Sequence, residues 1–170
     1  MAAGQVAKVE KLCRSYLTAM ESGDLDALLS LFTDDATATS PISGKQPVRD
    51  FYYYVMRITS ARSMVLKTIF IGTSDPSRAA IHIVYTRTVG NGKPATIEGI
   101  DIFELTGDLS KFTSVTIIYD TAPVRSRFRE AVGQAEFGLE RTGRTCLCPS
   151  ASSRPLAEFA EGTSLGNTHR

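Results

Sequence analysis

The sequence predicts an α+β fold in which three N-terminal helices pack on a curved antiparallel sheet and enclose a pocket. Up to about Met64, apolar residues recur at three- and four-residue spacing, which is the period of amphipathic helices. From Met64 onward they alternate with polar residues, which is the period of strands. Turn residues separate four long strand segments. A run of helices followed by a run of strands is typical of α+β domains.

Three helices are expected before the long strands. The stripe of the first helix includes Tyr16 and ends at Ser22-Gly23, and Asp24 is a typical N-cap for a second, short helix that ends before a turn at Asp34-Asp35. A third helix is expected to begin near residues 44–47, with a proline in its first turn. The apolar positions of the three helices are Val6, Val9, Leu12, Cys13, Tyr16, Leu17 and Met20, then Leu25, Leu28, Leu29 and Phe32, then Val48, Phe51, Tyr52, Val55 and Met56.

Strands are expected at five places. A short strand, A-T-A-T-S, covers residues 36–40 and ends before a proline, so Ser40 faces the same way as Ala36 and Ala38. The four long strands cover residues 64–72, 79–89, 95–105 and 111–120. The breaks between them carry Asp-Pro, Gly-Asn-Gly and Thr-Gly-Asp, which are typical of hairpin turns, so the long strands are predicted to form a meander.

Composition excludes several classes of function. The formal net charge of +1 provides no field to attract nucleic acid or an anionic membrane, and no run approaches the ~20 apolar residues of a membrane span. The N-terminus lacks the apolar region of a signal peptide, so a cytoplasmic protein is expected. The three cysteines form no C-x-x-C pair and have no histidine ligands nearby in sequence. We therefore expect neither a metal nor a cofactor.

The chain is predicted to divide near residue 123. Residues 1–123 hold all the predicted elements above, whereas residues 124–170 hold seven arginines but no lysine or aspartate and become rich in small and polar residues. One more helix is expected over residues 124–139, followed by a flexible tail.

Asp101 occupies an unexpected place in its strand. Alternation puts Asp101 on the same face as Gly99 and Phe103, while Glu98 and Glu104 lie on the opposite, wetter face. An ionised carboxylate among apolar neighbours is costly, so this group either has a hydrogen-bonding partner or is protonated with a raised pKa. A protonated carboxyl can donate a hydrogen bond at neutral pH. Tyr16, on a buried helical stripe, likewise brings a donor into the interior.

These residues occur within a recognisable pattern. The run Y-L-T-A-M-E-S-G-D-L-D-A-L-L-S-L-F-T-D-D-A-T, followed by S-P, R-D-F-Y and G-I-D-I-F-E-L, resembles the bacterial ketosteroid isomerases. That family belongs to the superfamily of cystatin-like cones that includes nuclear transport factor 2-like and SnoaL-like proteins. The similarity covers roughly residues 6–119. Its central segment is common to the whole superfamily, whereas the tyrosine before it and the aspartate of I-D-x-F are more specific to the isomerases.

The resemblance implies roles for several residues. Tyr16 and Asp101 match the tyrosine and the protonated aspartate that form the oxyanion hole of the isomerases. Tyr52 matches a tyrosine that hydrogen-bonds to the oxyanion tyrosine, and Tyr119 matches an aromatic residue that lines the steroid site. Phe103, on the same face as the aspartate, is the third expected substrate contact. The resemblance also implies a homodimer, paired through an exposed sheet face that bears Thr113, Val115, Ile117 and Tyr119 or their alternates.

Ser40 departs from the family pattern. The isomerases have E-D-P, with the aspartate as general base, where this chain has T-S-P. A serine hydroxyl cannot hold an abstracted proton near neutral pH without a further base. General acid-base catalysis contributes about 10²- to 10⁴-fold, so the family reaction is expected to be crippled unless another carboxylate substitutes. Asp35 and Asp120 are the candidates for that replacement.

Several functions fit these observations. The first is an isomerase-like enzyme that stabilises the enolate of an apolar carbonyl substrate through Tyr16 and Asp101, and a polyketide-cyclase-like enzyme on the same fold is its variant. A non-catalytic binding protein for an apolar phenol- or carbonyl-bearing ligand is the second. An interaction protein that recruits a partner through the arginine-bearing tail is the third.

Overall fold

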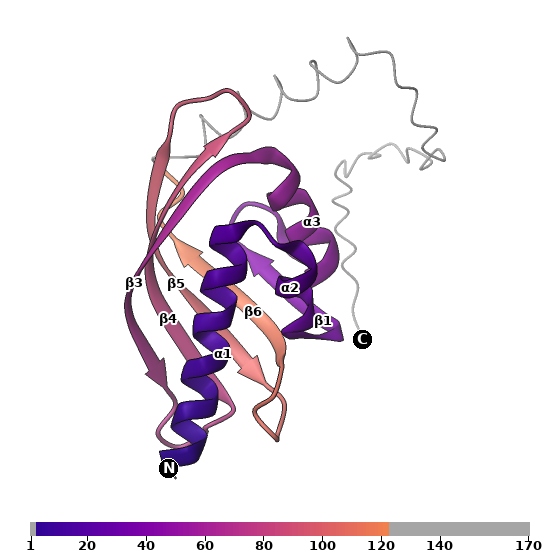
Figure 1. Ribbon diagram of the computed structural model, residues 1–170, viewed down its shortest axis with the longest axis vertical. Helices are drawn as coiled ribbons and strands as arrows, with labels where there is room; N and C mark the ends of the chain where they lie inside the picture. The colour runs from indigo at the N-terminus through magenta and orange to yellow at the C-terminus, as the bar shows by residue number, and fades with distance from the viewer. Residues whose placement is uncertain (1–2, 123–170) are drawn as a thin grey trace, which may run out of the picture.

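The computed structural model describes residues 3–122, and they form the predicted α+β fold (Figure 1). The elements in chain order are α1 (Ala3–Ser22), α2 (Leu25–Ser30), β1 (Phe32–Ser40), β2 (Gly44–Pro47), α3 (Val48–Ile58), β3 (Thr59–Ile71), β4 (Arg78–Val89), β5 (Ala95–Leu105) and β6 (Phe112–Tyr119). The boundary near residue 123, the predicted helix over 124–139 and the extension after it lie outside the described residues. No helix within 3–122 is long and apolar enough to cross a membrane.

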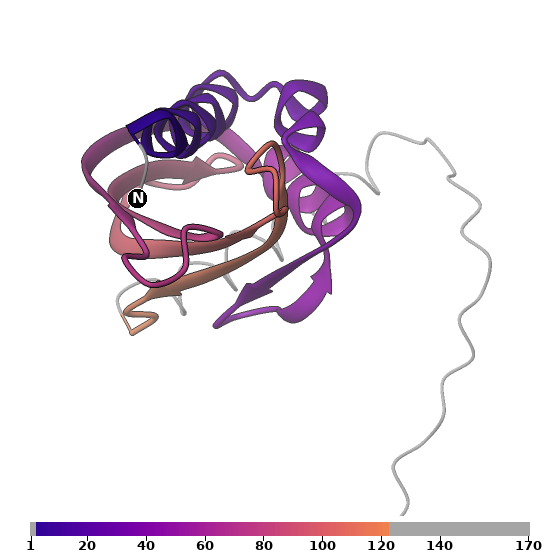
Figure 2. The same ribbon diagram turned by 90° about the horizontal axis from the view of Figure 1, so that it is seen from below.

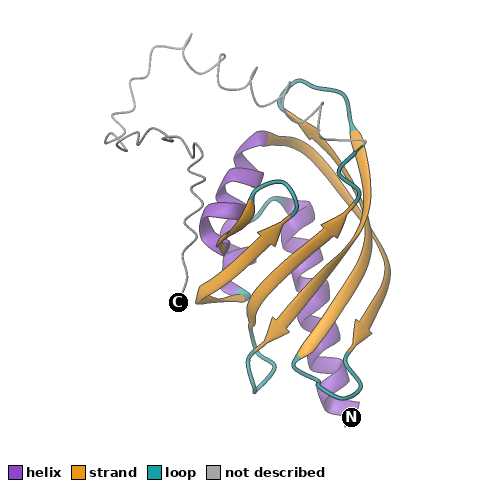
Figure 3. Ribbon diagram, turned by 180° about the vertical axis from the view of Figure 1, so that it is seen from behind, coloured by secondary structure: helices purple, strands orange, loops and turns teal. Residues whose placement is uncertain are grey.

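The strands form one sheet in the order β2-β1-β6-β5-β4-β3. The four long strands β3 to β6 pair antiparallel as a meander, which confirms that prediction, whereas β1 joins the sheet parallel to β6. Seen from below, the sheet curves around an interior that α1 and α3 cover on one side (Figure 2). Seen from behind, no helix of residues 3–122 lies on its outer face (Figure 3). Curvature of this kind leaves one concave face on which a pocket can form.

The first strand begins earlier than predicted. Phe32 was expected in the second helix and Asp34-Asp35 in a turn, but all three lie in β1. The pairing of β1 with β6 shifts between Phe32 and Thr37, so the two aspartates occupy an irregular, exposed part of the strand. Such a bulge lets Phe32 turn into the core while its acidic neighbours stay in water.

The predicted start of the third helix is also wrong by a few residues. Residues 44–47 form β2, which pairs with the end of β1 at Ser40 and Gly44. The helix begins at Val48, and Pro47 occupies its N-cap position. A proline has no backbone N–H to pair, so it suits the position just before a helix.

The helices bury the stripes that their spacing predicts. The buried residues of α1 are Val9, Leu12, Cys13, Tyr16, Ala19 and Met20. Asp24 caps α2, since its side chain accepts a hydrogen bond of 2.9 Å from the backbone N–H of Ala27. Burial, with a smaller effect from Glu10, raises the pKa of the Cys13 thiol to about 12, so this cysteine behaves as an apolar core residue.

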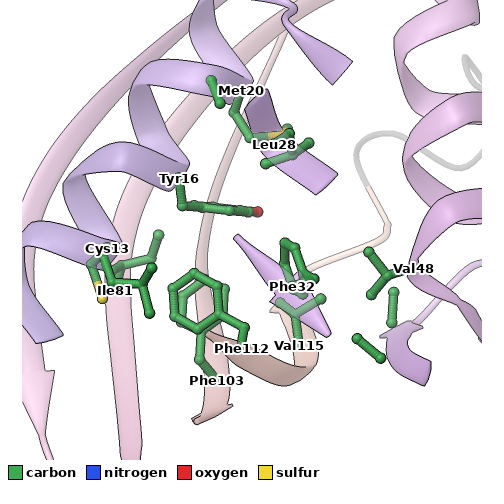
Figure 4. Close-up of a cluster of buried hydrophobic side chains, with 14 of the residues drawn as sticks. Cys13, Tyr16, Met20, Leu28, Phe32, Val48, Ile81, Phe103, Phe112 and Val115 are labelled. Carbon is green, nitrogen blue, oxygen red and sulfur yellow. The ribbon is translucent and has the colours of Figure 1, made fainter. Parts of the chain in front are cut away.

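An aromatic cluster surrounds Tyr16 in the core (Figure 4). The Tyr16 ring makes an edge contact with Phe103, with ring centroids 5.0 Å apart, and Phe103 stacks on Phe112 at 4.2 Å. Phe32 and Tyr52 complete the cluster at 6.4 and 6.2 Å from Tyr16. Rings packed from several sides leave the Tyr16 side chain little freedom, so the position of its hydroxyl is set by the fold.

Of the two alternating sets of residues on β6 that were considered for the exposed sheet face, the outer face carries the set between Val115, Ile117 and Tyr119. Val115 is fully buried, and Ile117 and Tyr119 line the interior. Ile118, between them in sequence, is 51% exposed on the outer face, and Ile100 pairs with it across β5 and β6. Dimerisation through this face stays a prediction, and two paired exposed isoleucines support it.

Candidate functional site

A pocket of about 450 Å³ lies between α1, α3 and the concave face of the sheet. The lining is mostly apolar and aromatic, and a few polar groups converge on it, as is typical of small-molecule sites. The lining residues are Tyr16, Met20, Ser40, Ile42, Ser43, Gln46, Phe51, Tyr52, Tyr54, Val55, Met64, Ile83, Tyr85, Arg87, Ile97, Gly99, Asp101, Ile117 and Tyr119.

Asp101 lies on the pocket wall with its side chain 4% exposed. It faces inward because β5 alternates, which leaves Glu98 and Glu104 exposed on the other side. Burial raises the pKa of the Asp101 carboxyl to about 7, although its hydrogen bond with Tyr16 acts in the opposite direction. A carboxyl with this pKa exchanges its proton near neutral pH and is a hydrogen-bond donor below it.

Three side chains from three elements, Asp101 on β5, Tyr16 on α1 and Tyr52 on α3, form a chain of hydrogen bonds with Tyr16 in the middle. The Tyr16 hydroxyl, on α1, donates to Oδ2 of Asp101 at 3.0 Å and lies 3.1 Å from the Tyr52 hydroxyl on α3. Burial, with the neighbouring Asp101 charge next in size, raises the pKa of both phenols well above the ordinary value. Both phenols therefore keep their protons at neutral pH. The result is a buried donor network that ends at the pocket surface.

Ser40 and Tyr119 lie together on the neighbouring part of the wall. Ser40 ends β1, is 7% exposed, and its Oγ accepts a hydrogen bond of 3.3 Å from the backbone N–H of Ile42. Its side chain shares the inward face with buried Ala36 and Ala38, as the alternation predicts. Burial raises the pKa of the Tyr119 phenol, while the Arg87 charge and the Ser40 hydroxyl act to lower it.

Three of the expected site residues lie outside the pocket. Phe103 was expected to contact substrate, but it is fully buried behind Tyr16 and supports that ring instead. Asp35 and Asp120, the candidate replacement bases, are exposed and do not line the pocket. The Asp120 carboxylate accepts a hydrogen bond from the backbone N–H of Ala122. Among the described lining residues, Asp101 is the only acidic side chain.

Sequence reasoning missed several polar residues of the pocket, of which Tyr85 and Arg87 lie on one strand. Both follow Ile83 on the inward face of β4, and the Arg87 side chain is 9% exposed. Period-two alternation places Ile81, Ile83, Tyr85 and Arg87 on one face, and this pattern could have predicted that Tyr85 and Arg87 point into the pocket. Because arginine side chains are usually exposed, the residue type predicted an exposed position for Arg87.

Gly99 keeps the floor of the pocket open between Ile83 and Tyr119. A Cβ at this position would lie 2.7 Å from the Ile118 carbonyl oxygen and 3.1 Å from Cβ of Tyr119. We expect Gly99→Ala to destabilise the fold by roughly 1–3 kcal/mol, because backbone must move to admit the methyl group. Urea unfolding measures this, with Gly107→Ala as a control that meets nothing within 4 Å. Equal stability of the two variants would contradict the prediction.

Two comparisons with known proteins bear on this site. Residues 13–113 match the family model of the SnoaL-like domain. Among solved structures, PrhC from Penicillium brasilianum superposes with a TM-score of 0.66 at 18% identity, over 81% of this chain and 97% of that protein.

Two further solved structures are similar, one of an enzyme and one described only by its fold. The epoxide hydrolase/cyclase-like enzyme SalBIII of salinomycin pyran-ring formation has a TM-score of 0.59 and 19% identity, over 67% of this chain and 92% of its own. A Catenulispora acidiphila protein with a ketosteroid isomerase-like fold, in complex with trimethylamine, has a TM-score of 0.56 and 15% identity, over 64% and 85%. At these identities the similarity concerns the fold.

Proposed function

This chain belongs to the SnoaL-like domain family, and we propose that it is an enzyme acting on a small apolar carbonyl compound in the manner of a steroid Δ-isomerase. The observation that carries the proposal is the buried pair of Tyr16 and Asp101 on the wall of an apolar pocket, with their oxygens 3.0 Å apart. In this role the pair binds the oxygen of the substrate carbonyl.

The chemistry required is removal of a proton from the carbon next to the carbonyl. The C–H electron pair becomes a C=C bond, and the carbonyl oxygen takes the negative charge. Tyr16 donates to that oxygen, and Asp101 donates as well while it is protonated, since burial raises its pKa to about 7. When the Tyr16 hydroxyl donates to the substrate oxygen, the Tyr52 hydroxyl, 3.1 Å away, donates to the Tyr16 oxygen. Donors in an apolar site stabilise charge more than they do in water.

The acceptor of the proton differs from that of the isomerases. Ser40 occupies the position that the resemblance assigns to the general base, and a serine hydroxyl is too weak a base for this step. The proton is therefore taken by water or by a group of the substrate. Turnover of a simple ketosteroid by the natural protein is accordingly expected to be slow.

Exchange of the hydrogens next to a ketone for deuterium tests the oxyanion role directly. We expect the protein to accelerate exchange in 2-tetralone, followed by NMR, and Tyr16→Phe or Asp101→Asn to reduce that acceleration by about 10²- to 10³-fold, the cost of losing one oxyanion donor. Tyr53→Phe is the matched control, because Tyr53 is 58% exposed on the same helix as Tyr52. Exchange at the natural rate in both site variants would contradict the proposal.

A non-catalytic binding protein is the second candidate, and one observation favours it. Asp35 and Asp120 lie outside the pocket, so within the described lining no second carboxylate is available as a base. A pocket with donors and no base suits a ligand that presents a phenol or carbonyl oxygen. Tight binding of 2-naphthol without acceleration of exchange would favour this function over catalysis.

A cyclase-like enzyme is the variant that the pKa of Asp101 favours. A carboxyl with a pKa of about 7 is well matched to general acid catalysis near neutral pH. SalBIII, described as epoxide hydrolase/cyclase-like, has the same fold. In this variant Asp101 delivers its proton to an epoxide oxygen as one C–O bond of the epoxide breaks. A hydroxyl oxygen elsewhere in the same substrate forms a new C–O bond at that carbon, and the hydroxyl proton passes to water, from which Asp101 is protonated again.

A further inference from the structure

Arg87 places a second polar group far from Asp101 in the same pocket. Asp101 pairs with Ile81 across β5 and β4, and Arg87 lies six residues further along β4 on the same face. At about 3.3 Å per residue the two levels are ~20 Å apart along the strand. Between them the wall is formed mainly by Ile83 and Ile97. The pocket therefore has polar groups at two levels and an apolar middle.

The Arg87 side chain is held inside the pocket. It is 9% exposed, and its Cζ lies 5.8 Å from the centroid of the Tyr85 ring. Its charge also acts on Tyr119, because it lowers a phenol pKa that burial raises. Guanidinium groups keep their charge even when buried, so this end of the pocket is positive. Within the described lining, Arg87 is the only basic side chain.

The Tyr85 hydroxyl lies in the same wall of the pocket, beside Arg87. Burial raises the pKa of this phenol, while the charge of Arg87 and the side chains of Thr59 and Arg87 beside it act to lower it. A phenol in this position can donate a hydrogen bond to a ligand oxygen in the pocket. A cation and a donor thus face the same space.

We propose that Arg87 and Tyr85 form a subsite for a carboxylate, so that the ligand is an elongated apolar acid with a carbonyl or phenol oxygen at its other end. The planar guanidinium fork matches a carboxylate, and the hydroxyl of Tyr85 supplies a further donor. A single positive charge balances one carboxylate, whereas a phosphate dianion would leave excess charge in an apolar pocket. This inference names the substrate class of the proposed function, and only the carbonyl end rests on that function.

Four biphenyl compounds test both ends of the ligand separately. They are 4′-hydroxybiphenyl-4-carboxylic acid, its methyl ester, its methyl ether, and the compound methylated at both ends. Affinities are measured by calorimetry at pH 6, below the Asp101 pKa of about 7. The corresponding naphthalene series, whose members are shorter, is measured alongside. The long Arg87 side chain can reach toward Asp101, so the distance between the two polar groups is shorter than the distance between their backbone levels.

We expect the acid to bind about 10- to 100-fold more tightly than its ester in at least one series, as is typical of charge-assisted hydrogen bonds. Arg87→Met should bring that ratio close to one, and Arg57→Met, an exposed arginine of α3, should leave it unchanged. Where Arg87→Met does not fold, as judged by circular dichroism, Arg87→Lys replaces it and should reduce the ratio, since it keeps the charge and loses the fork.

The outcomes separate this inference from the proposed function. Three results would overturn the subsite. The first is an ester that binds as tightly as the acid in both series. The second is an acid preference that survives Arg87→Met, or Arg87→Lys where that variant replaces it, and the third is no binding by any of the compounds. The ratio of phenol to methyl ether reports on Tyr16 and Asp101 instead. A normal acid preference without a phenol preference keeps the subsite and removes support from the oxyanion role.

Discussion

Ser40→Asp is expected to raise the rate at which the protein isomerises a 5-ene-3-ketosteroid to its conjugated enone by about 10²- to 10⁴-fold, the usual contribution of a general base. Ser40 lies on the pocket wall at the end of β1, and its side chain is 7% exposed. An aspartate there would face the same space as Tyr16 and Asp101, which supply the oxyanion donors. The reaction is followed by ultraviolet absorbance for the natural protein and the variant side by side.

Ser43→Asp is the matched control for this gain. Ser43 also lines the pocket, but it lies in the exposed turn after β1, so a carboxylate there adds charge without occupying the position of the base. An equal rate for the two variants would show that position 40 has no special place in the reaction. If neither variant nor the natural protein turns over, the likeness to the isomerases is one of fold alone, and the roles assigned to Tyr16 and Asp101 lose most of their support.

The free energy of unfolding is expected to fall by roughly 2–3 kcal/mol between pH 5 and pH 8 because of Asp101 alone. Burial raises its pKa to about 7 in the folded protein, against about 3.9 in the unfolded chain. Between these two values the folded protein holds a proton that the unfolded chain has released. The contribution is therefore complete below pH 4 and is lost as the pH rises through 7. Urea unfolding over this range measures the effect.

Asp101→Asn removes this pH dependence, since an amide does not titrate. The difference in unfolding free energy between the natural protein and this variant should therefore change in favour of the variant as the pH rises. Asp35→Asn, at an exposed position on β1, controls for the loss of a carboxylate in general. Parallel curves for the natural protein and Asp101→Asn would mean that the carboxyl titrates as it does in water, and Asp101 would then be ionised in any reaction at neutral pH.

Local patterns predicted the elements better than their ends. The helical stripe around Tyr16 and the alternation around Asp101 are both present as expected, because period alone decides which side chains share a face. The start of β1 was misplaced because it depends on pairing with the distant strand β6. The start of α3 was misplaced because residues 44–47 form a hairpin with the end of β1. Asp34-Asp35 has turn chemistry, yet a register shift against β6 absorbs it within a strand.

The sequence by itself determined the fold class and the inward direction of Asp101, because alternation along one strand needs no knowledge of the other strands. Only the tertiary structure decided what Asp101 meets. Tyr16 and Tyr52 come from helices at a separation of 36 residues from each other, and Tyr16 is 85 residues from Asp101. The tertiary structure also decided that Phe103 packs behind Tyr16 and that the Arg87 side chain is buried. Burial of a charged side chain depends on how strongly the sheet curves over it, and curvature is a property of all the strands together.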